Sequence, residues 1–161
     1  MKLAVFRPRK LKIEEIEIMR KNSGFTITEL MVTIAVIAIL ASLAIPNFIA
    51  WLPNYRLRSG AEEIQSTLQF ARLTAIKRNA TATVTFDIAN ETYRAFVVGG
   101  QTIRGGRMPA GIDIDSTDFG GDSVEFNSRG IATPAGTAVV RNNLGKAKTI
   151  RVYITGNSRI D

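Results

Sequence analysis

The strongest constraint in this sequence is an uncharged apolar run of sixteen residues from Leu30 to Ile45. With residues 25–29 added, the apolar helix has 21 residues. At 1.5 Å per residue it is about 32 Å long, which matches a bilayer hydrocarbon core of about 30 Å. The run therefore predicts one transmembrane helix over about residues 25–45.

The distribution of charge predicts the orientation of this helix. Residues 1–24 hold seven basic and three acidic side chains, a net charge of +4 out of +7 for the whole chain. Basic residues beside a membrane span stay in the cytoplasm, so the N-terminus should be cytoplasmic and the C-terminal part exported. Because the excess charge is concentrated here, the total charge alone does not indicate a nucleic-acid-binding protein.

The residue inventory argues against catalysis. The chain has no Cys and no His, which excludes disulfides, thiolate and imidazole catalysis, and every Cys or His metal site. It also contains no phosphate-binding loop, no dinucleotide fingerprint and no paired carboxylates at a defined helical spacing. We therefore expect no catalytic residue, no metal, no cofactor and no enzymatic activity.

A specific motif precedes the apolar run, Ser23-Gly24-Phe25-Thr26-Ile27-Thr28-Glu29-Leu30. It resembles the N-terminus of a type IV prepilin. The resemblance implies that a prepilin peptidase cuts after Gly24, that Phe25 becomes the methylated N-terminus, and that Glu29 pairs with the Phe25 amine of a neighbouring subunit in a filament. A carboxylate in a membrane segment costs about 2.5–3.5 kcal/mol and needs a partner. The alternative is that Glu29 lies at headgroup depth and snorkels.

Two further alternatives concern processing. Ser42-Leu43-Ala44 has the small-x-small form of a signal-peptidase site, which would release a soluble secreted binding module after Ala44. Glu29 inside the apolar stretch argues against this. Residues 19–24 already form a complete short leader, so residues 1–18 are surplus. One interpretation, which we prefer, is that they result from the choice of an upstream start codon. The other is that they are a real extension, which could form a short amphipathic helix at the inner membrane surface.

Beyond the span, the sequence predicts that the helix continues to about Asn79. Pro46 and Pro53 should bend or locally break it without ending it. Apolar residues then recur at spacings of three and four, which is typical of an amphipathic helix that packs on its own domain. This stripe consists of Leu57, Ala61, Ile64, Leu68, Ala71 and Ala75.

After Ala80 the apolar period changes from helical to two. Residues 81–88 alternate as a half-buried antiparallel strand, and further strands are predicted at 93–98, 123–127, 137–141 and 149–155, with Ile154 on the apolar face of the last. Eleven of the thirteen glycines fall between Gly99 and Gly156, where we expect turns. The sheet should cover the helical stripe in a two-layer α+β domain.

The C-terminal half contains a Phe-x-x-x-Gly element from Phe126 to Gly130, a turn at Gly145, and a strand ending in Thr155-Gly156 before Asn157-Ser158-Arg159-Ile160. This pattern resembles the GspH/FimT group of minor pilins and pseudopilins. The group's usual Thr-Gly-Arg is replaced by Thr-Gly-Asn, and no Cys pair staples this region. The implied fold is a ladle-like type IV pilin fold: a leader (1–24), a long helix (25–79) that is half anchor and half domain core, and a periplasmic β-rich domain (80–161).

The resemblance also implies a function. We expect a minor pseudopilin in the periplasmic pseudopilus of a type II secretion system, which drives protein export. The alternative is a FimT-like minor pilin of a type IV pilus, with a role in pilus assembly, motility or DNA uptake. The implied partners are other pilins or pseudopilins, the prepilin peptidase and an inner-membrane assembly platform.

Three local clusters have two interpretations each. Asp113, Asp115 and Asp118, with Asp122 and Glu125 nearby, could bind calcium, but the spacing fits no EF-hand loop and a solvated acidic loop is favoured. Residues 104–107 (Arg-Gly-Gly-Arg) suit a hairpin tip better than a single-strand binder. Residues 126–160 carry only basic charges, and a solvated face is favoured over salt-sensitive DNA binding. The candidate DNA or partner contacts are Arg141, Lys146, Lys148, Arg151 and Arg159.

Overall fold

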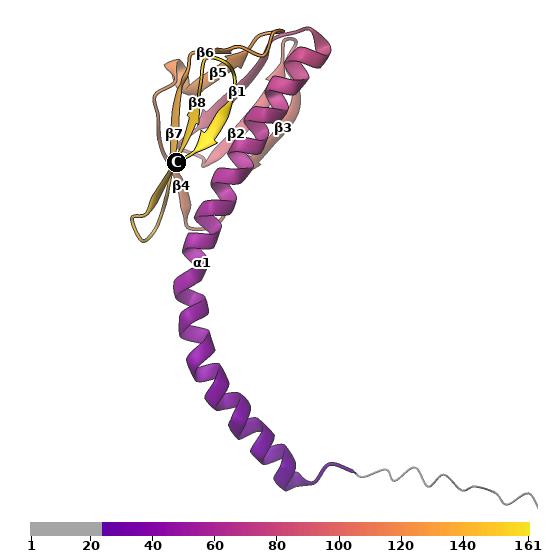
Figure 1. Ribbon diagram of the computed structural model, residues 1–161, viewed down its shortest axis with the longest axis vertical. Helices are drawn as coiled ribbons and strands as arrows, with labels where there is room; N and C mark the ends of the chain where they lie inside the picture. Colours follow the sequence, from indigo (N-terminus) through magenta and orange to yellow (C-terminus); the bar gives the residue numbers. More distant parts are fainter. Residues whose placement is uncertain (1–23) are drawn as a thin grey trace, which may run out of the picture. The chain divides into compact units, whose positions relative to one another are not determined.

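The computed structural model describes residues 24–161, so the predicted leader up to Ser23, including its surplus residues 1–18, lies outside the described residues. In this range one α-helix precedes nine strands and a short 3-10 helix (Figure 1). The chain forms two compact units, one up to Leu40 and one from Ala41 to Asp161. The first unit, where described, consists of the start of the helix.

The helix α1 (Ile27–Arg78) has 52 residues and passes both prolines. Each proline removes one backbone hydrogen bond, yet the helix continues through Pro46 and Pro53, which confirms that neither ends it. Of the two predicted alternatives, a bend or a local break, the break does not occur. The apolar N-terminal part is long and apolar enough to cross a membrane. Lys77 and Arg78 lie in the last turn, where positive charges interact favourably with the helix dipole.

The C-terminal part of α1 packs on the β-strands through the predicted stripe. All six stripe residues are buried in one apolar core, which confirms the amphipathic interpretation. Gly60 completes this face, because a Cβ built there would lie 2.7 Å from Met108 Cε and 3.4 Å from Pro109 Cδ. Burial of this face against the strands contributes to the hydrophobic stabilisation of the second unit.

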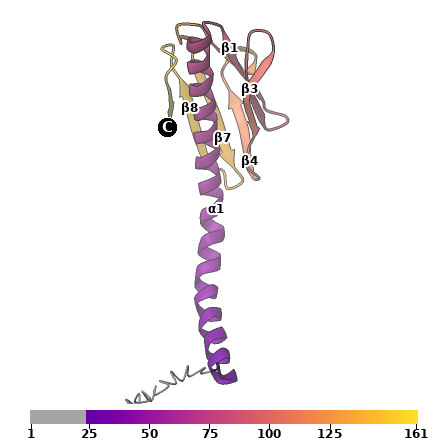
Figure 2. The ribbon, with the colours of Figure 1, turned by 90° about the vertical axis from the view of Figure 1, so that its right-hand side faces the viewer.

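The strands form two antiparallel sheets, not one as predicted (Figures 1 and 2). A five-stranded sheet has the order β3-β2-β1-β5-β6, and a four-stranded sheet has the order β4-β7-β8-β9. The fold class is nevertheless the expected one, a long N-terminal helix packed on antiparallel β-structure. The bounds are β1 (Ala82–Asp87), β2 (Thr92–Val97), β3 (Gln101–Arg107), β4 (Ile112–Thr117), η1 (Gly120–Asp122), β5 (Ser123–Phe126), β6 (Ala132–Thr133), β7 (Gly136–Asn142), β8 (Ala147–Val152) and β9 (Ser158–Ile160).

Three sequence predictions about the strands are wrong. Residues 104–107 are not a hairpin tip but lie in β3, an edge strand that pairs with β2. Asp113 and Asp115 are not in a loop but in β4, where Ile112 and Ile114 supply the buried face. The last long strand, β8, ends at Val152 because the chain turns at residues 153–156, which leaves Ile154 exposed.

Candidate assembly site

The first turn of α1 is held by reciprocal hydrogen bonds between Thr26 and Glu29. Glu29 Oε2 accepts from the Thr26 backbone N–H at 3.0 Å and from the Thr26 hydroxyl at 2.9 Å. In return, Thr26 Oγ1 accepts from the Glu29 backbone N–H at 3.2 Å. This arrangement is a capping box, which satisfies backbone donors that the start of a helix leaves without partners. Glu29 therefore has a structural role within its own chain.

The same turn remains accessible to another molecule. Phe25 and Glu29 are exposed, and both hydrogen bonds to the carboxylate reach Oε2, so Oε1 accepts neither of them. An open groove of about 450 Å³ is lined by Phe25, Thr26, Thr28, Glu29, Val32 and Thr33. The groove joins the predicted new N-terminus and the predicted assembly carboxylate in one surface.

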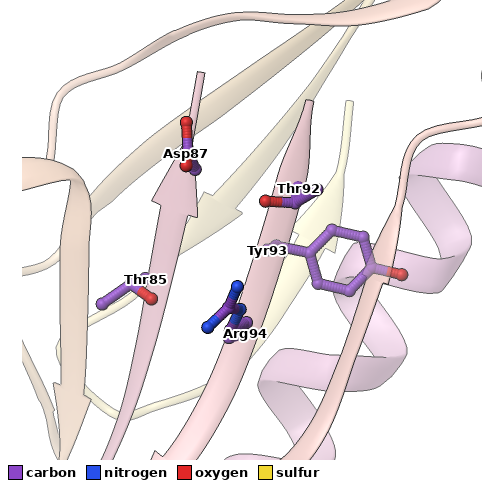
Figure 3. Close-up of a pocket in the computed structure, with 5 residues that line it drawn as sticks. All are labelled: Thr85, Asp87, Thr92, Tyr93 and Arg94. Carbon is purple, nitrogen blue, oxygen red and sulfur yellow. The ribbon is translucent and has the colours of Figure 1, made fainter. Parts of the chain in front are cut away.

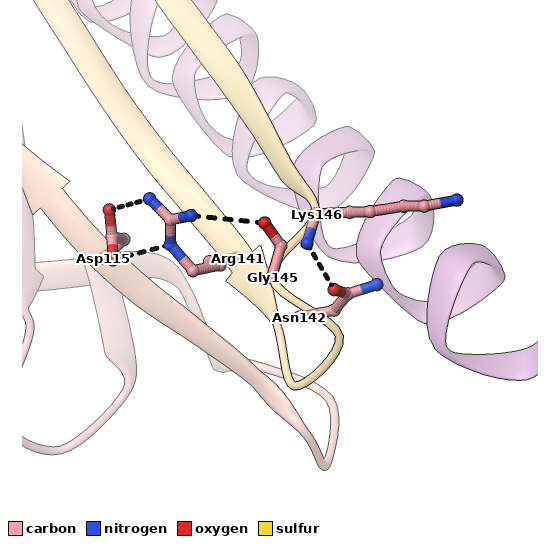
Figure 4. A network of polar contacts seen from close by, with 5 residues as sticks. All are labelled: Asp115, Arg141, Asn142, Gly145 and Lys146. Carbon is pink, nitrogen blue, oxygen red and sulfur yellow. Dashed lines mark hydrogen bonds and ion pairs between the residues drawn. The ribbon is translucent and has the colours of Figure 1, made fainter.

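Most of the predicted DNA or partner contacts are engaged in ion pairs. Arg141 on β7 binds Asp115 on β4 through two hydrogen bonds, Nε to Oδ1 at 3.0 Å and Nη2 to Oδ2 at 2.9 Å (Figure 4). The register of the two strands shifts between Ile114 and Ser116, so Asp115 sits at a bulge. The hydrogen bond to Arg141 lowers the pKa of Asp115, and the same bond raises the pKa of Arg141.

Asp161 contacts three more of these basic side chains. The Asp161 carboxylate lies 3.3 Å from Arg151 Nε and 3.4 Å from Arg159 Nε, and its backbone oxygen lies 3.5 Å from Lys148 Nζ. The Lys146 side chain extends away from the Asp115–Arg141 pair (Figure 4). Asp115 and Asp161 offset much of the positive charge of these residues. The structure therefore supports phosphate binding by this surface less than the sequence does.

The residues of the acidic cluster are engaged in separate hydrogen bonds. Asp115 binds Arg141, Asp118 accepts from the Thr137 backbone N–H, and Asp122 Oδ1 accepts from the Thr117 hydroxyl at 2.5 Å. Within residues 24–161, no group of three or more acidic side chains gathers in a way that could hold a metal ion.

A depression of about 220 Å³ lies over β1 and β2, on the side away from the core (Figure 3). The residues around it are Thr85, Asp87, Thr92, Tyr93 and Arg94. The Tyr93 ring turns away from it and packs in the core, where burial raises the pKa of its hydroxyl and the Glu63 carboxylate acts in the same direction. Asn90 donates to Asp87 and lowers its pKa. Two hydroxyls, one carboxylate and one guanidinium surround this depression, and they form no recognisable catalytic set.

Arg72 is an important residue that the sequence analysis missed. Its Nε donates to the Gly130 backbone oxygen at 3.0 Å, and its Nη1 donates to Asn157 Oδ1 at 2.9 Å. Arg72 thus ties helix α1 to two turns of the C-terminal pattern. Gly156 lies close to both Arg72 and Gly130 and has a φ of +77°. A Cβ at this position would collide with the Gly130 backbone oxygen. The Asn of Thr155-Gly156-Asn157 therefore has a defined role as an acceptor for Arg72.

This architecture is that of a type IV pilin-like subunit, and comparison with known proteins identifies the family. A family model described as type II transport protein GspH matches residues 60–157, and a prokaryotic N-terminal methylation motif matches residues 19–45. The chain belongs to the GspH family of minor pilins and pseudopilins.

Solved structures share the fold. The minor pilin FimU of Pseudomonas aeruginosa superposes with a TM-score of 0.57 at 17% identity, covering 67% of this chain and 90% of FimU. The minor pseudopilin EpsH of Vibrio cholerae gives a TM-score of 0.57 at 14% identity, covering 66% of this chain and 96% of EpsH. At these identities the likeness concerns the fold alone.

A curated relative matches in sequence over a short segment. The type IV major pilin protein PilA of Myxococcus xanthus is 45% identical over 49 residues, which is 30% of this chain and 20% of that protein. The match thus spans a fifth of the relative's length.

Proposed function

We propose that the chain is a minor pseudopilin, a structural subunit of the periplasmic pseudopilus of a type II secretion system. The observation that carries this proposal is the combination, in one chain, of a GspH-type domain over residues 60–157 with an N-terminal methylation motif over residues 19–45. The first feature belongs to a family described by type II transport, and the second to subunits that assemble after processing.

The processing steps follow from the motif. The prepilin peptidase cleaves after Gly24, and Phe25 becomes the methylated N-terminus. Before assembly, residues 25–45 span the inner membrane with the N-terminus in the cytoplasm and the domain in the periplasm. The assembly platform then extracts the helix into a bundle with other pilins or pseudopilins.

Glu29 has two successive partners in this mechanism. In the isolated chain its carboxylate caps α1 through Thr26, and Oε1 takes no part in that cap. In the filament Glu29 pairs with the Phe25 amine of a neighbouring subunit. An opposite charge compensates the cost of placing a carboxylate among apolar helices.

A minor pilin of a type IV pilus is the second candidate. It is favoured by the 45% identity to a major pilin over 49 residues. The anchor chemistry is common to both machines, so the two candidates differ in the filament that the subunit joins and not in the site.

Two measurements test the proposal. Mass spectrometry of the membrane-extracted protein should identify methylated Phe25 as the N-terminus, whereas a start at Ile45 would indicate a signal peptide and a secreted module. Deletion of the gene should then abolish export of proteins to the medium and leave surface pili and twitching intact. The reverse phenotype would favour the type IV pilus candidate.

A further inference from the structure

Three aromatic side chains form a stripe on one face of α1. The ring centroids of Phe48 and Trp51 are 6.3 Å apart, and those of Trp51 and Tyr55 are 4.9 Å apart in a stacked arrangement. All three side chains are exposed, and 53% of Trp51 is accessible. Three neighbouring exposed aromatic rings are unusual on a soluble surface and indicate an interaction site.

The position of this aromatic stripe in the sequence indicates its partner. Every residue from Leu30 to Tyr55 is uncharged, and the first charge after them is Arg56. A helix of this length is about 39 Å long, which exceeds a hydrocarbon core of about 30 Å and approaches a full bilayer of about 40–45 Å. The aromatic stripe ends the uncharged segment, at the depth where Trp and Tyr concentrate in membrane proteins.

Two turns of the β-domain lie beside the same part of the helix. Asn142 Nδ2, at the start of the β7–β8 turn, lies 3.5 Å from Asn54 Oδ1. Arg56 Nη1 donates to the Ala110 backbone oxygen of the β3–β4 turn at 3.0 Å. The two turns are joined by a 3.2 Å hydrogen bond from the Asn143 N–H to the Gly111 oxygen. Both therefore belong to the end of the domain from which residues 41–56 extend (Figures 1 and 2).

The β7–β8 turn presents one apolar and one cationic side chain. Leu144 is 58% exposed, and Lys146 extends away from the strands (Figure 4). Asn142 Oδ1 accepts from the backbone N–H groups of Leu144 and Lys146 at 3.1 and 2.9 Å, so the turn is preorganised. An exposed leucine beside a lysine suits the boundary between acyl chains and anionic headgroups.

We propose that the aromatic stripe and the hairpin tip (Leu144 and Lys146) together dock the domain on the phospholipid headgroups of the periplasmic leaflet of the inner membrane. This inference rests on the proposed function, because residues 25–45 must span the bilayer for the aromatic stripe to reach those headgroups. The docked state is the storage state of the subunit, and extraction into the filament breaks the contact.

Trp51 provides a direct test because it is the only tryptophan of the chain. The full chain is reconstituted in vesicles of phosphatidylcholine and phosphatidylglycerol at low protein density. Trp51 fluorescence should be quenched most by lipids brominated at shallow acyl positions, less by deeply brominated lipids, and little by aqueous acrylamide. Full acrylamide quenching in chains that float with the vesicles would overturn the docking inference and leave the proposed function intact. Chains that do not float would overturn both.

The hairpin tip is tested with a label at an introduced cysteine, since the chain has none of its own. An environment-sensitive fluorophore on Leu144→Cys should shift to the blue in the vesicles. The matched control is Leu73→Cys, because Leu73 is 62% exposed but lies farther along α1; its label should stay water-like. Adding Lys146→Gln should reduce the shift at position 144 mainly in vesicles rich in phosphatidylglycerol.

Two results would overturn the hairpin part of the inference. One is an identical signal at positions 144 and 73. The other is a blue shift at position 144 that grows with the protein-to-lipid ratio, since this would make a second copy of the chain the occupant of the surface.

Discussion

Thr26 and Glu29 satisfy each other's polar groups at the start of α1, with the Glu29 carboxylate accepting from both the N–H and the hydroxyl of Thr26. The carboxylate that we propose for assembly is therefore already hydrogen-bonded within its own chain. This internal cap reduces the cost of carrying a carboxylate next to the apolar segment. Substitutions can distinguish this observed capping role of Glu29 from its proposed role in charge pairing.

Glu29→Gln keeps a side-chain acceptor for Thr26 but removes the charge. We expect normal membrane insertion and strongly reduced incorporation into filaments, as for Glu29→Ala. Thr26→Ala loses the cap, at a cost of about 1 kcal/mol to the helix start, but keeps the charge and should still be incorporated. The measurement is the ratio of filament-bound to membrane-bound protein on immunoblots. Wild-type incorporation of Glu29→Gln would contradict charge pairing.

The Asp115–Arg141 pair should make stability depend on acid pH. Because Arg141 lowers the pKa of Asp115, the pair stabilises the fold above the ordinary Asp pKa of about 3.9, and this contribution is lost as pH falls through the lower folded-state value. Asp115→Asn should therefore lower the Tm by a constant small amount at pH 5–8, and the difference from wild type should vanish in stronger acid.

The control for this pair is Arg141→Gln, which should show the same pH dependence. The effects of the two substitutions should not add fully in the double variant, because both remove the same ion pair. Arg141→Gln also removes the 3.3 Å hydrogen bond from Arg141 Nη1 to the Gly145 backbone oxygen, so its effect should be the larger of the two. Both side chains are partly exposed, so added salt should reduce the difference in Tm. A Tm difference that persists unchanged below pH 3 would refute the ionic origin.

The sequence predicts elements well where apolar periodicity is strong. The stripe from Leu57 to Ala75 and the alternation of β1 each bury one complete face, so the pattern reflects the packing. Strand β3 escaped prediction because an edge strand with a mostly exposed surface carries little alternation. In β4, Ile112 and Ile114 do alternate, but their acidic neighbours favoured a loop interpretation.

The candidate site shows a different limit of sequence analysis. The Thr26–Glu29 cap is local, with a spacing of three residues, and could be predicted from sequence. The partners of Arg141 and Arg72 are 26 and 58 residues away and depend on strand register and on which turns reach the helix. A one-signed basic segment was therefore visible in the sequence, while the carboxylates that pair with it were not.

Gly156→Ala should destabilise the domain more than Gly145→Ala. Both glycines have positive φ, +77° and +79°, so each substitution carries a backbone penalty of about 1–2 kcal/mol. At Gly145 a Cβ has nothing within 4 Å, whereas at Gly156 it meets the Gly130 backbone oxygen and Arg72. We expect a clearly larger loss of unfolding free energy for Gly156→Ala, measured by chemical denaturation. Equal losses would show that the Arg72 cluster relaxes freely.

Ile64→Ala tests whether the C-terminal part of α1 is the core of the β-domain. Ile64 is completely buried in the apolar cluster, so removing three carbons should cost about 2–5 kcal/mol through lost burial and a cavity. Leu73→Ala on the exposed face of the same helix should stay within about 0.5 kcal/mol of wild type. Denaturation of the detergent-solubilised chain, followed by the β-sheet circular dichroism signal, measures both. A small effect of Ile64→Ala would mean that the sheets hold together without the helix, and the anchor and the domain would then be mechanically separable.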